Sequence, residues 1–170
     1  RRRRVAQAAI EVSRLMAPKP TRAFEYDPRQ LRSVRATCLS FAAEIGDLTE
    51  EIVIVGGLVP SLLIDQDLIQ SADERHAGTA DLDVALASRL LDNQLYQGLT
   101  ERLRQGSFSP DVNDKGNITR QRWTTDGPPV VTVDFLIAPT LPDDLPGGLR
   151  SIERDFAAFI VPGLHLAFEE

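Results

Sequence analysis

The stretch HAGTADLDVALA, residues 76–87, places two aspartates one residue apart at the start of an apolar run. Side chains alternate between the two faces of a β-strand, so Asp81 and Asp83 would leave one face while Leu82 and Val84 leave the other. The pattern predicts a strand that buries one face and presents both carboxylates on the opposite face. Two carboxylates held this close repel each other unless a cation lies between them.

Composition limits the classes of protein that this chain can belong to. A chain of 170 residues, 42% of them hydrophobic, is long enough for one compact domain or for one domain with a small helical addition. The net charge of -6 argues against coating nucleic acid by charge alone, although a local basic face could still receive an RNA end. A single cysteine, Cys38, excludes a disulfide framework and a cysteine-based zinc site within the chain and favours a reducing, cytoplasmic setting. The apolar runs are too short to span a bilayer, so we expect no membrane contact.

The rest of the sequence predicts helices alternating with strands. Between Gln30 and Ile45, apolar residues recur at three- and four-residue steps, which is typical of an amphipathic helix that Gly46 can end. Apolar runs bounded by glycine and proline predict the strands. The expected elements are helices over 3–16 and 30–45, a strand over 51–57, a helix over 58–70, a strand over 79–87, a helix over 88–105 and two strands within 117–139.

A third aspartate, Asp134, lies in the middle of the apolar run VVTVDFLIAP, where an unpaired charge is costly. If its strand neighbours that of Asp81 and Asp83, the three carboxylates form a cluster able to hold the two metal ions that nucleotidyl transfer uses. Oxygen ligands without histidine or cysteine favour Mg²⁺ or Mn²⁺ over zinc. Upstream, the Gly56–Gly57 pair between a strand and a helix lets the backbone approach a phosphate.

These motifs in combination resemble the signature of the DNA polymerase beta-type nucleotidyltransferase superfamily. Within it, VGGLVPSLLI, HAGTADLDVAL, VTVDFLIAP and the tail VPGLHLAFEE resemble the AbiEii-type group, the toxin halves of type IV toxin–antitoxin systems. The likeness covers about residues 50–170. It implies an α/β (α+β) fold with a mixed, mostly antiparallel sheet flanked by helices. Residues 1–46 would form an N-terminal helical extension packed on a nucleotidyltransferase core of residues 47–170.

The resemblance also implies a reaction and its participants. A nucleotidyl group would pass from a nucleoside triphosphate, bound through Mg²⁺ or Mn²⁺, to a macromolecular acceptor such as tRNA or another RNA, with an antitoxin protein as a partner. Asp81 and Asp83 would bind both ions, whereas Asp134 would bind the catalytic ion and help to deprotonate the attacking hydroxyl. The triphosphate would lie along Gly56, Gly57 and Ser61.

Two questions stay open at this point. The family's C-terminal helical region supplies basic residues to the nucleotide site, yet this sequence has no lysine after Lys115. Either the chain is a fragment with its core truncated before that region, or an arginine takes that role, the candidates being Arg75, Arg120, Arg122, Arg150 and Arg154. The alternative functions are a non-catalytic nucleotide-binding or regulatory module with this fold, and an antibiotic-modifying nucleotidyltransferase. Haloacid-dehalogenase phosphatases also begin with Asp-x-Asp, but DLDVALAS fits their motif only in part.

Overall fold

The computed structural model of the protein describes residues 22, 25–71, 74–92 and 95–169, so the helix expected over 3–16 lies outside the described residues. The helices and strands are α2 (Pro28–Ile45), β1 (Ile52–Val55), α3 (Val59–Leu63), β2 (Asp81–Leu86), α4 (Arg89–Asp92), α5 (Leu95–Gln105), β3 (Phe108–Val112), β4 (Ile118–Thr125), β5 (Thr132–Ile137), β6 (Leu149–Ser151) and β7 (Ala157–Ile160). Short 3₁₀ turns are η2 (Gly46–Glu51), η3 (Gly56–Leu58), η4 (Gln66–Leu68) and η6 (Leu164–Phe168).

The strands of the described residues form one mixed sheet in the order β1-β2-β5-β4-β3, with β7 also on β5 and β6 on β7. The pairs β2–β5 and β5–β7 are parallel and the other pairs are antiparallel. Because β2 occupies one edge of β5 along its whole length, β4 and β7 share the other edge, β4 near the start of β5 and β7 near its end. The predicted fold class, a mostly antiparallel mixed sheet flanked by helices, is confirmed.

Helix α2 begins and ends at residues whose chemistry suits those positions. The Asp27 carboxylate accepts a hydrogen bond from the Arg29 backbone N–H at 2.8 Å, which caps the first turn. Gly46 ends the helix with a φ of 57°, a left-handed value that glycine adopts without strain. Between these ends, Phe41 packs edge-on against Phe108 and at a tilt against Phe135. Helix α2 is therefore part of the core.

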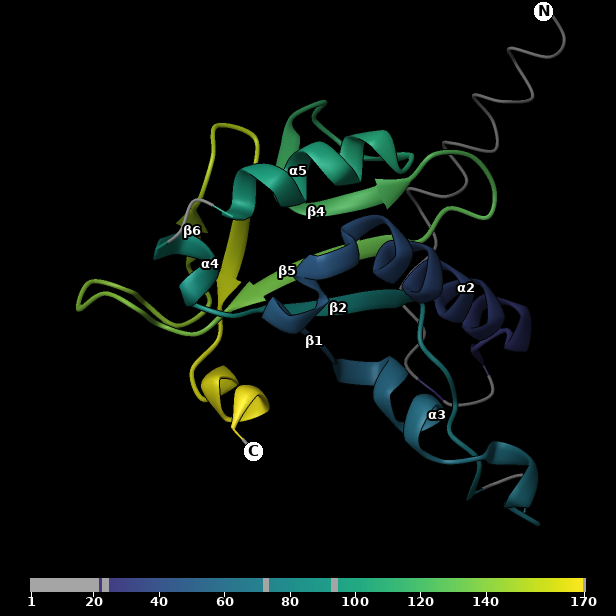
Figure 1. The fold of residues 1–170 in the computed structure, drawn as a ribbon. Coiled ribbons are helices and arrows are strands. Elements are labelled where there is room, and N and C mark those ends of the chain that lie inside the picture. Colours follow the sequence, from purple (N-terminus) through teal and green to yellow (C-terminus); the bar gives the residue numbers. More distant parts are fainter. Residues whose placement is uncertain (1–21, 23–24, 72–73, 93–94, 170) are drawn as a thin grey trace, which may run out of the picture.

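The two faces of the sheet have different coverings. One face carries the main core, which includes Leu82 and Val84 of β2 and Phe135 of β5. Helices α2 and α5 cover this face (Figure 1). On the other face, Leu164 of η6 packs on Ala85 in a smaller apolar cluster. Since residues that alternate along a strand point to opposite faces, the aspartates of β2 lie on the face away from α2 and α5.

Several elements differ from the predictions. The helix expected over 58–70 ends at Leu63, because Asp65 accepts a hydrogen bond from the Asp67 backbone N–H and starts a new 3₁₀ turn. Strands β3, β6 and β7 were not predicted, and β3 includes Pro110 at a register shift against β4. The predicted strands at β1, β2, β4 and β5 are confirmed, as are the described parts of the helix over 88–105.

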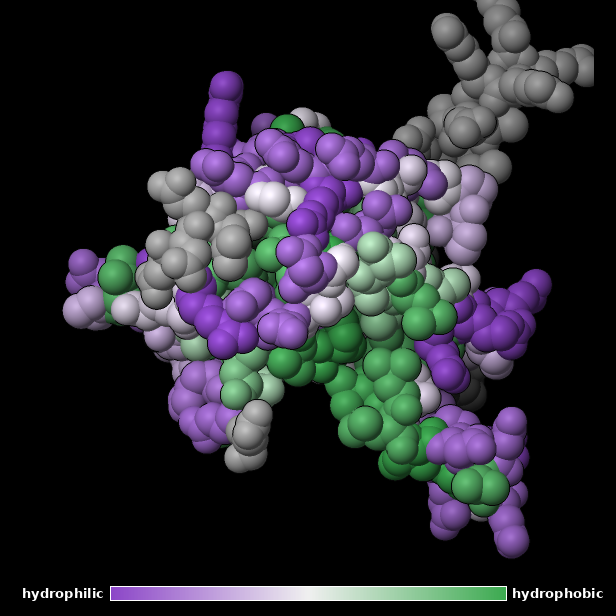
Figure 2. Space-filling view, in the orientation of Figure 1, coloured by the Kyte–Doolittle hydropathy of each residue, from purple (hydrophilic) through white to green (hydrophobic). Residues whose placement is uncertain are grey.

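An arm carrying α3 and η4 extends from the sheet and exposes apolar side chains, which Figure 2 shows as a green ridge. Leu63 and Leu68 are 79% and 78% exposed, and Leu62 and Ile64 are also exposed. Within the described ranges, each helix is either too short or too polar to cross a membrane.

Candidate active site

The parallel pairing of β2 and β5 brings the predicted carboxylates to one face of the sheet. Asp83 lies directly opposite Asp134 in the register, and Asp81 lies opposite Thr132. Residues paired in register on adjacent strands share a face, and adjacent strands are about 4.8 Å apart. Asp81, two residues before Asp83 on β2, points to the same side. An Asp134 on the opposite face of the sheet would have excluded a shared site. The register places Asp134 on the same face as Asp81 and Asp83.

Thr79 anchors the first of these aspartates. Its hydroxyl lies 2.9 Å from Oδ1 of Asp81 and donates a hydrogen bond to that carboxylate. Thr79 is itself buried, and a Cβ built on Gly57 would lie only 2.9 Å from the Thr79 hydroxyl oxygen. The glycine turn after β1 therefore lets Thr79 enter beside β2 and position Asp81.

Gly56 lies against the second aspartate. It has a φ of 71°, and a Cβ built on it would lie 2.1 Å from Oδ2 of Asp83. No real Cβ fits at that distance, so the Asp83 carboxylate occupies the space that any side chain at position 56 would need. β1 pairs Val55 with Asp83, which explains why the turn that follows β1 lies at this carboxylate.

The third aspartate binds a cation from the protein itself. Arg122 of β4 is the antiparallel partner of Asp134, and its Nε and one terminal nitrogen donate to the two Asp134 oxygens, both at 2.7 Å. This is the bidentate geometry in which arginine binds carboxylates most strongly. Asp134 is only 6% exposed, so the pair removes the cost of an isolated buried charge.

The surroundings of Arg122 are acidic. Its hydrogen bonds to Asp134 raise the pKa of the guanidinium, desolvation works against them, and the negative charges of Asp134, Asp111 and Asp81 act in the same direction as the hydrogen bonds. The guanidinium thus stays charged and interacts with two of the three predicted ligands. Asp111 and Arg122 were not among the predicted catalytic residues, because the contact of Arg122 with Asp134 and the effect of Asp111 on Arg122 depend on how β4 aligns with β5 and β3.

A divalent ion suits this donor set but not this arrangement of side chains. The three carboxylates on one face are hard oxygen donors of the kind that Mg²⁺ and Mn²⁺ prefer. As the side chains stand, however, no group of three or more acidic, histidine or cysteine side chains in the described residues is gathered as a metal site. The Arg122 guanidinium holds both oxygens of Asp134 instead. A site formed by all three aspartates requires Arg122 to release Asp134.

Of the three residues predicted to contact the triphosphate, Gly56 and Gly57 lie next to the carboxylates, whereas the Ser61 hydroxyl is bonded within α3. Gly56 and Gly57 form a 3₁₀ turn next to Asp83 and Thr79, within reach of the carboxylates. Ser61 is buried, and its hydroxyl donates to the Leu58 carbonyl oxygen at 2.8 Å. α3 spans only five residues, so its dipole adds little beyond the turn. Contact between Ser61 and the triphosphate stays a prediction, and its hydroxyl is already engaged within α3.

The candidate basic residues differ in the groups that they contact. Arg122 contacts a predicted ligand directly, whereas Arg120 donates to the Ser151 hydroxyl at 2.9 Å. Arg150 binds Asp144 in the loop before β6, and Arg75 donates from Nε to the Ile69 carbonyl oxygen at 3.1 Å. Of these four arginines, Arg122 is the one whose described contact is with a predicted ligand.

The segment between Gly57 and Asp81 is tied together by its own hydrogen bonds. The Gln66 side chain donates to the Ile64 carbonyl oxygen at 3.1 Å and accepts from the His76 backbone N–H at 2.8 Å. The Gly78 N–H donates to Nδ1 of His76 at 3.2 Å. His76 is thus part of the loop structure that leads into Thr79.

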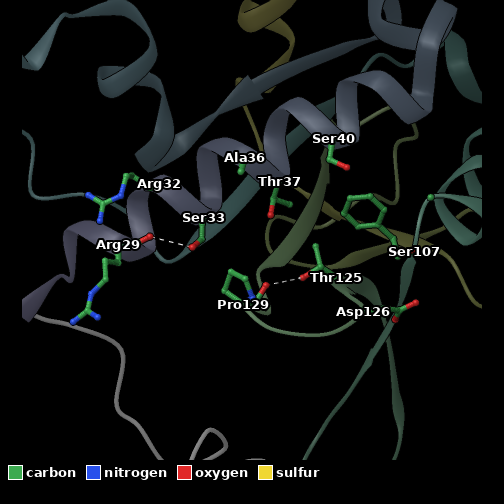
Figure 3. A pocket seen from close by; sticks show the side chains of 12 residues that line it. Arg29, Arg32, Ser33, Ala36, Thr37, Ser40, Ser107, Thr125, Asp126 and Pro129 are labelled. Carbon is green, nitrogen blue, oxygen red and sulfur yellow. Dashed lines mark hydrogen bonds between the residues drawn. The ribbon is translucent and has the colours of Figure 1, made fainter.

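A separate groove of about 580 Å³ lies between α2 and the turn that joins β4 to β5 (Figure 3). Arg29, Arg32 and Ser33 line it from α2, and Thr125 and Pro129 face them across the groove. None of the three aspartates lines it, because α2 packs on the opposite face of the sheet. The groove and the carboxylates are two distinct features.

Comparisons with protein-family models, with curated proteins and with solved structures find no match to this chain. The assignment of a function therefore depends on the residues and their geometry.

Proposed function

We propose that this protein is a divalent-metal-dependent nucleotidyltransferase that passes a nucleotidyl group from a nucleoside triphosphate to a macromolecular acceptor. The observation that carries the proposal is the register that pairs Asp83 with Asp134 and sets Asp81 on the same face, beside the Gly56 turn. Three carboxylates on one face of two paired strands, beside a glycine turn, are the kinds of groups that nucleotidyl transfer uses to hold divalent ions.

Each residue has a defined task in this reaction. Asp81 and Asp83 would hold divalent ions, which neutralise charge on the triphosphate when bound. Asp134 would share an ion with them and accept the proton of the attacking acceptor hydroxyl. The acceptor hydroxyl oxygen forms a bond to the α-phosphorus. The bond from the α-phosphorus to the oxygen that bridges the α- and β-phosphates breaks, and pyrophosphate leaves. The backbone of Gly56 and Gly57 would lie along the phosphates.

The acceptor and the biological role are proposed from the sequence resemblance. We infer that the acceptor is an RNA end, such as that of tRNA, and that the protein acts as the toxin of a type IV toxin–antitoxin system. In bacteria, expression of the wild-type chain should then slow growth, whereas Asp83→Asn should not. Equal toxicity of the two forms would contradict nucleotidyl transfer as the cause.

A second candidate is a non-catalytic nucleotide-binding module with the same fold. The bidentate hold of Arg122 on Asp134 favours it, because a carboxylate that permanently binds arginine cannot serve a metal. Turnover separates the two candidates, since both would bind a triphosphate but only one would consume it.

The experiment uses each ribonucleoside triphosphate labelled at the α-phosphate, with Mg²⁺ and total RNA. Wild type should label one RNA class with one preferred triphosphate, and Asp83→Asn should reduce labelling to background. Asp143→Asn is the matched control: it removes one carboxylate from an exposed loop and should label as wild type does. An Asp83→Asn variant as active as wild type would refute the proposal. Labelling of an aminoglycoside in a parallel reaction, without labelling of RNA, would favour an antibiotic-modifying enzyme.

A further inference from the structure

At Asp134, the Arg122 guanidinium occupies the position that a metal ion would take. Arg122 donates to both oxygens of Asp134, and the Asp134 side chain is almost entirely buried. The Arg122 side chain is 40% exposed, so it binds a buried carboxylate and is itself partly in contact with solvent. An arginine placed in this way can leave Asp134 for water without unfolding the strand that carries it.

Charge balance makes the exchange of one cation for another favourable. Removing Arg122 alone would leave Asp134 buried and unpaired next to Asp83, which is costly. A divalent ion held by the aspartates would replace the lost hydrogen bonds with metal–oxygen bonds and offset more negative charge than one guanidinium does. The Asp134 carboxylate therefore binds either the Arg122 guanidinium or a divalent ion, and not both at once.

We propose that Arg122 is the resident cation of this site and that a divalent ion competes with it for the Asp134 carboxylate. This inference rests on the proposed function, because it assigns a regulatory step to the same site. The metal-free protein is then held in an inactive arrangement, and metal binding releases a guanidinium on the face where the triphosphate would lie. One residue thereby links metal entry to the supply of a positive charge for phosphate.

The neighbouring Arg120 offers a matched control. It lies two residues earlier on β4, so it points to the same face as Arg122 and carries the same charge. Its guanidinium donates to the Ser151 hydroxyl. Removal of Arg120 changes the local charge by the same amount without freeing Asp134.

The test measures Mn²⁺ affinity by electron paramagnetic resonance, without nucleotide, for wild type, Arg122→Gln and Arg120→Gln. Competition predicts that Arg122→Gln binds Mn²⁺ about tenfold more tightly than wild type, since a bidentate charge-assisted contact no longer has to be broken. Arg120→Gln should stay within about twofold of wild type, because its guanidinium contacts the Ser151 hydroxyl and no bond to Asp134 is lost. Equal or weaker binding by Arg122→Gln, an equal gain in both variants, or no binding by any of the three would overturn the proposal.

A second variant covers the case in which Arg122→Gln does not fold. Arg122→Lys keeps the positive charge but loses the fork that binds both oxygens, so its Mn²⁺ affinity should fall between those of wild type and the expected Gln variant. A Lys variant that binds Mn²⁺ no better than wild type would contradict competition. The transfer assay stays independent: tighter Mn²⁺ binding by Arg122→Gln without any RNA labelling by wild type would retain the competition and refute the transferase.

Discussion

Replacing Gly56 with alanine tests how closely the glycine turn and the Asp83 carboxylate are packed. The new Cβ would lie 2.1 Å from Oδ2 and 3.0 Å from Cγ of Asp83. The backbone at this position has a φ of 71°, which strains any residue with a side chain. The substitution therefore has two separate costs, one from the backbone and one from the contact.

The two costs can be estimated and measured apart. Backbone strain at a left-handed residue costs about 1–2 kcal/mol, and displacing a packed side chain adds about 1–3 kcal/mol. Gly56→Ala should thus destabilise the fold by about 2–5 kcal/mol. Gly127 has a φ of 81°, and a Cβ added there would meet no atom within 4 Å, so Gly127→Ala reports the backbone cost alone.

Urea unfolding of the metal-free protein, followed by circular dichroism, supplies the free energies of unfolding. In the Asp83→Ala background the carboxylate is absent. The loss of unfolding free energy caused by Gly56→Ala should therefore be about 1–3 kcal/mol smaller in that background than in wild type. Additive effects, or a Gly56→Ala cost no larger than that of Gly127→Ala, would refute the close contact between the turn and Asp83.

Three further outcomes follow from buried or hydrogen-bonded groups. Backbone N–H donors and Arg150 lower the pKa of Asp144 from its usual value of 3.8. The ionised Asp144 therefore stabilises the fold fully above that usual pKa, and the stabilisation is lost as pH falls through the lower pKa of the folded protein. Asp144→Asn should flatten the acid limb of a plot of urea midpoint against pH between about pH 2 and 6. Burial raises the pKa of Cys38, so a thiol reagent should label it slowly in the native protein and rapidly in urea, and equally fast labelling would contradict its burial. Phe135→Ala, which removes a fully buried ring packed on Phe156, should lower the free energy of unfolding by about 3–5 kcal/mol in the same urea assay.

Sequence alone predicted the face that carries the aspartates, because alternation along a strand is a local property. Asp81 and Asp83 had to share a side once β2 was recognised, and the apolar run around Asp134 marked a second strand, whose pairing with β2 only the structure shows. The short strands β6 and β7 escaped prediction because a few residues between prolines and glycines carry too little periodicity.

The pairing of Arg122 with Asp134 was beyond a sequence-based prediction for a different reason. It depends on the register of β4 against β5, which the length of the turn at 126–131 sets. A shift of one residue would move Arg122 to the core face and Trp123 to the carboxylates. The burial of the Ser61 hydroxyl likewise depends on how the short helix α3 packs on the fold, which its sequence does not reveal.

The most direct test of the central claim compares two positions of the same label. Wild-type protein, Mg²⁺ and RNA are incubated with the preferred triphosphate labelled either at the α-phosphate or at the γ-phosphate. Nucleotidyl transfer assisted by Asp81, Asp83 and Asp134 predicts label in RNA from the α-position only, with γ-label released as pyrophosphate, and neither label in RNA with Asp83→Asn. Label transferred from the γ-position, or α-label that persists in the Asp83→Asn reaction, would contradict the account.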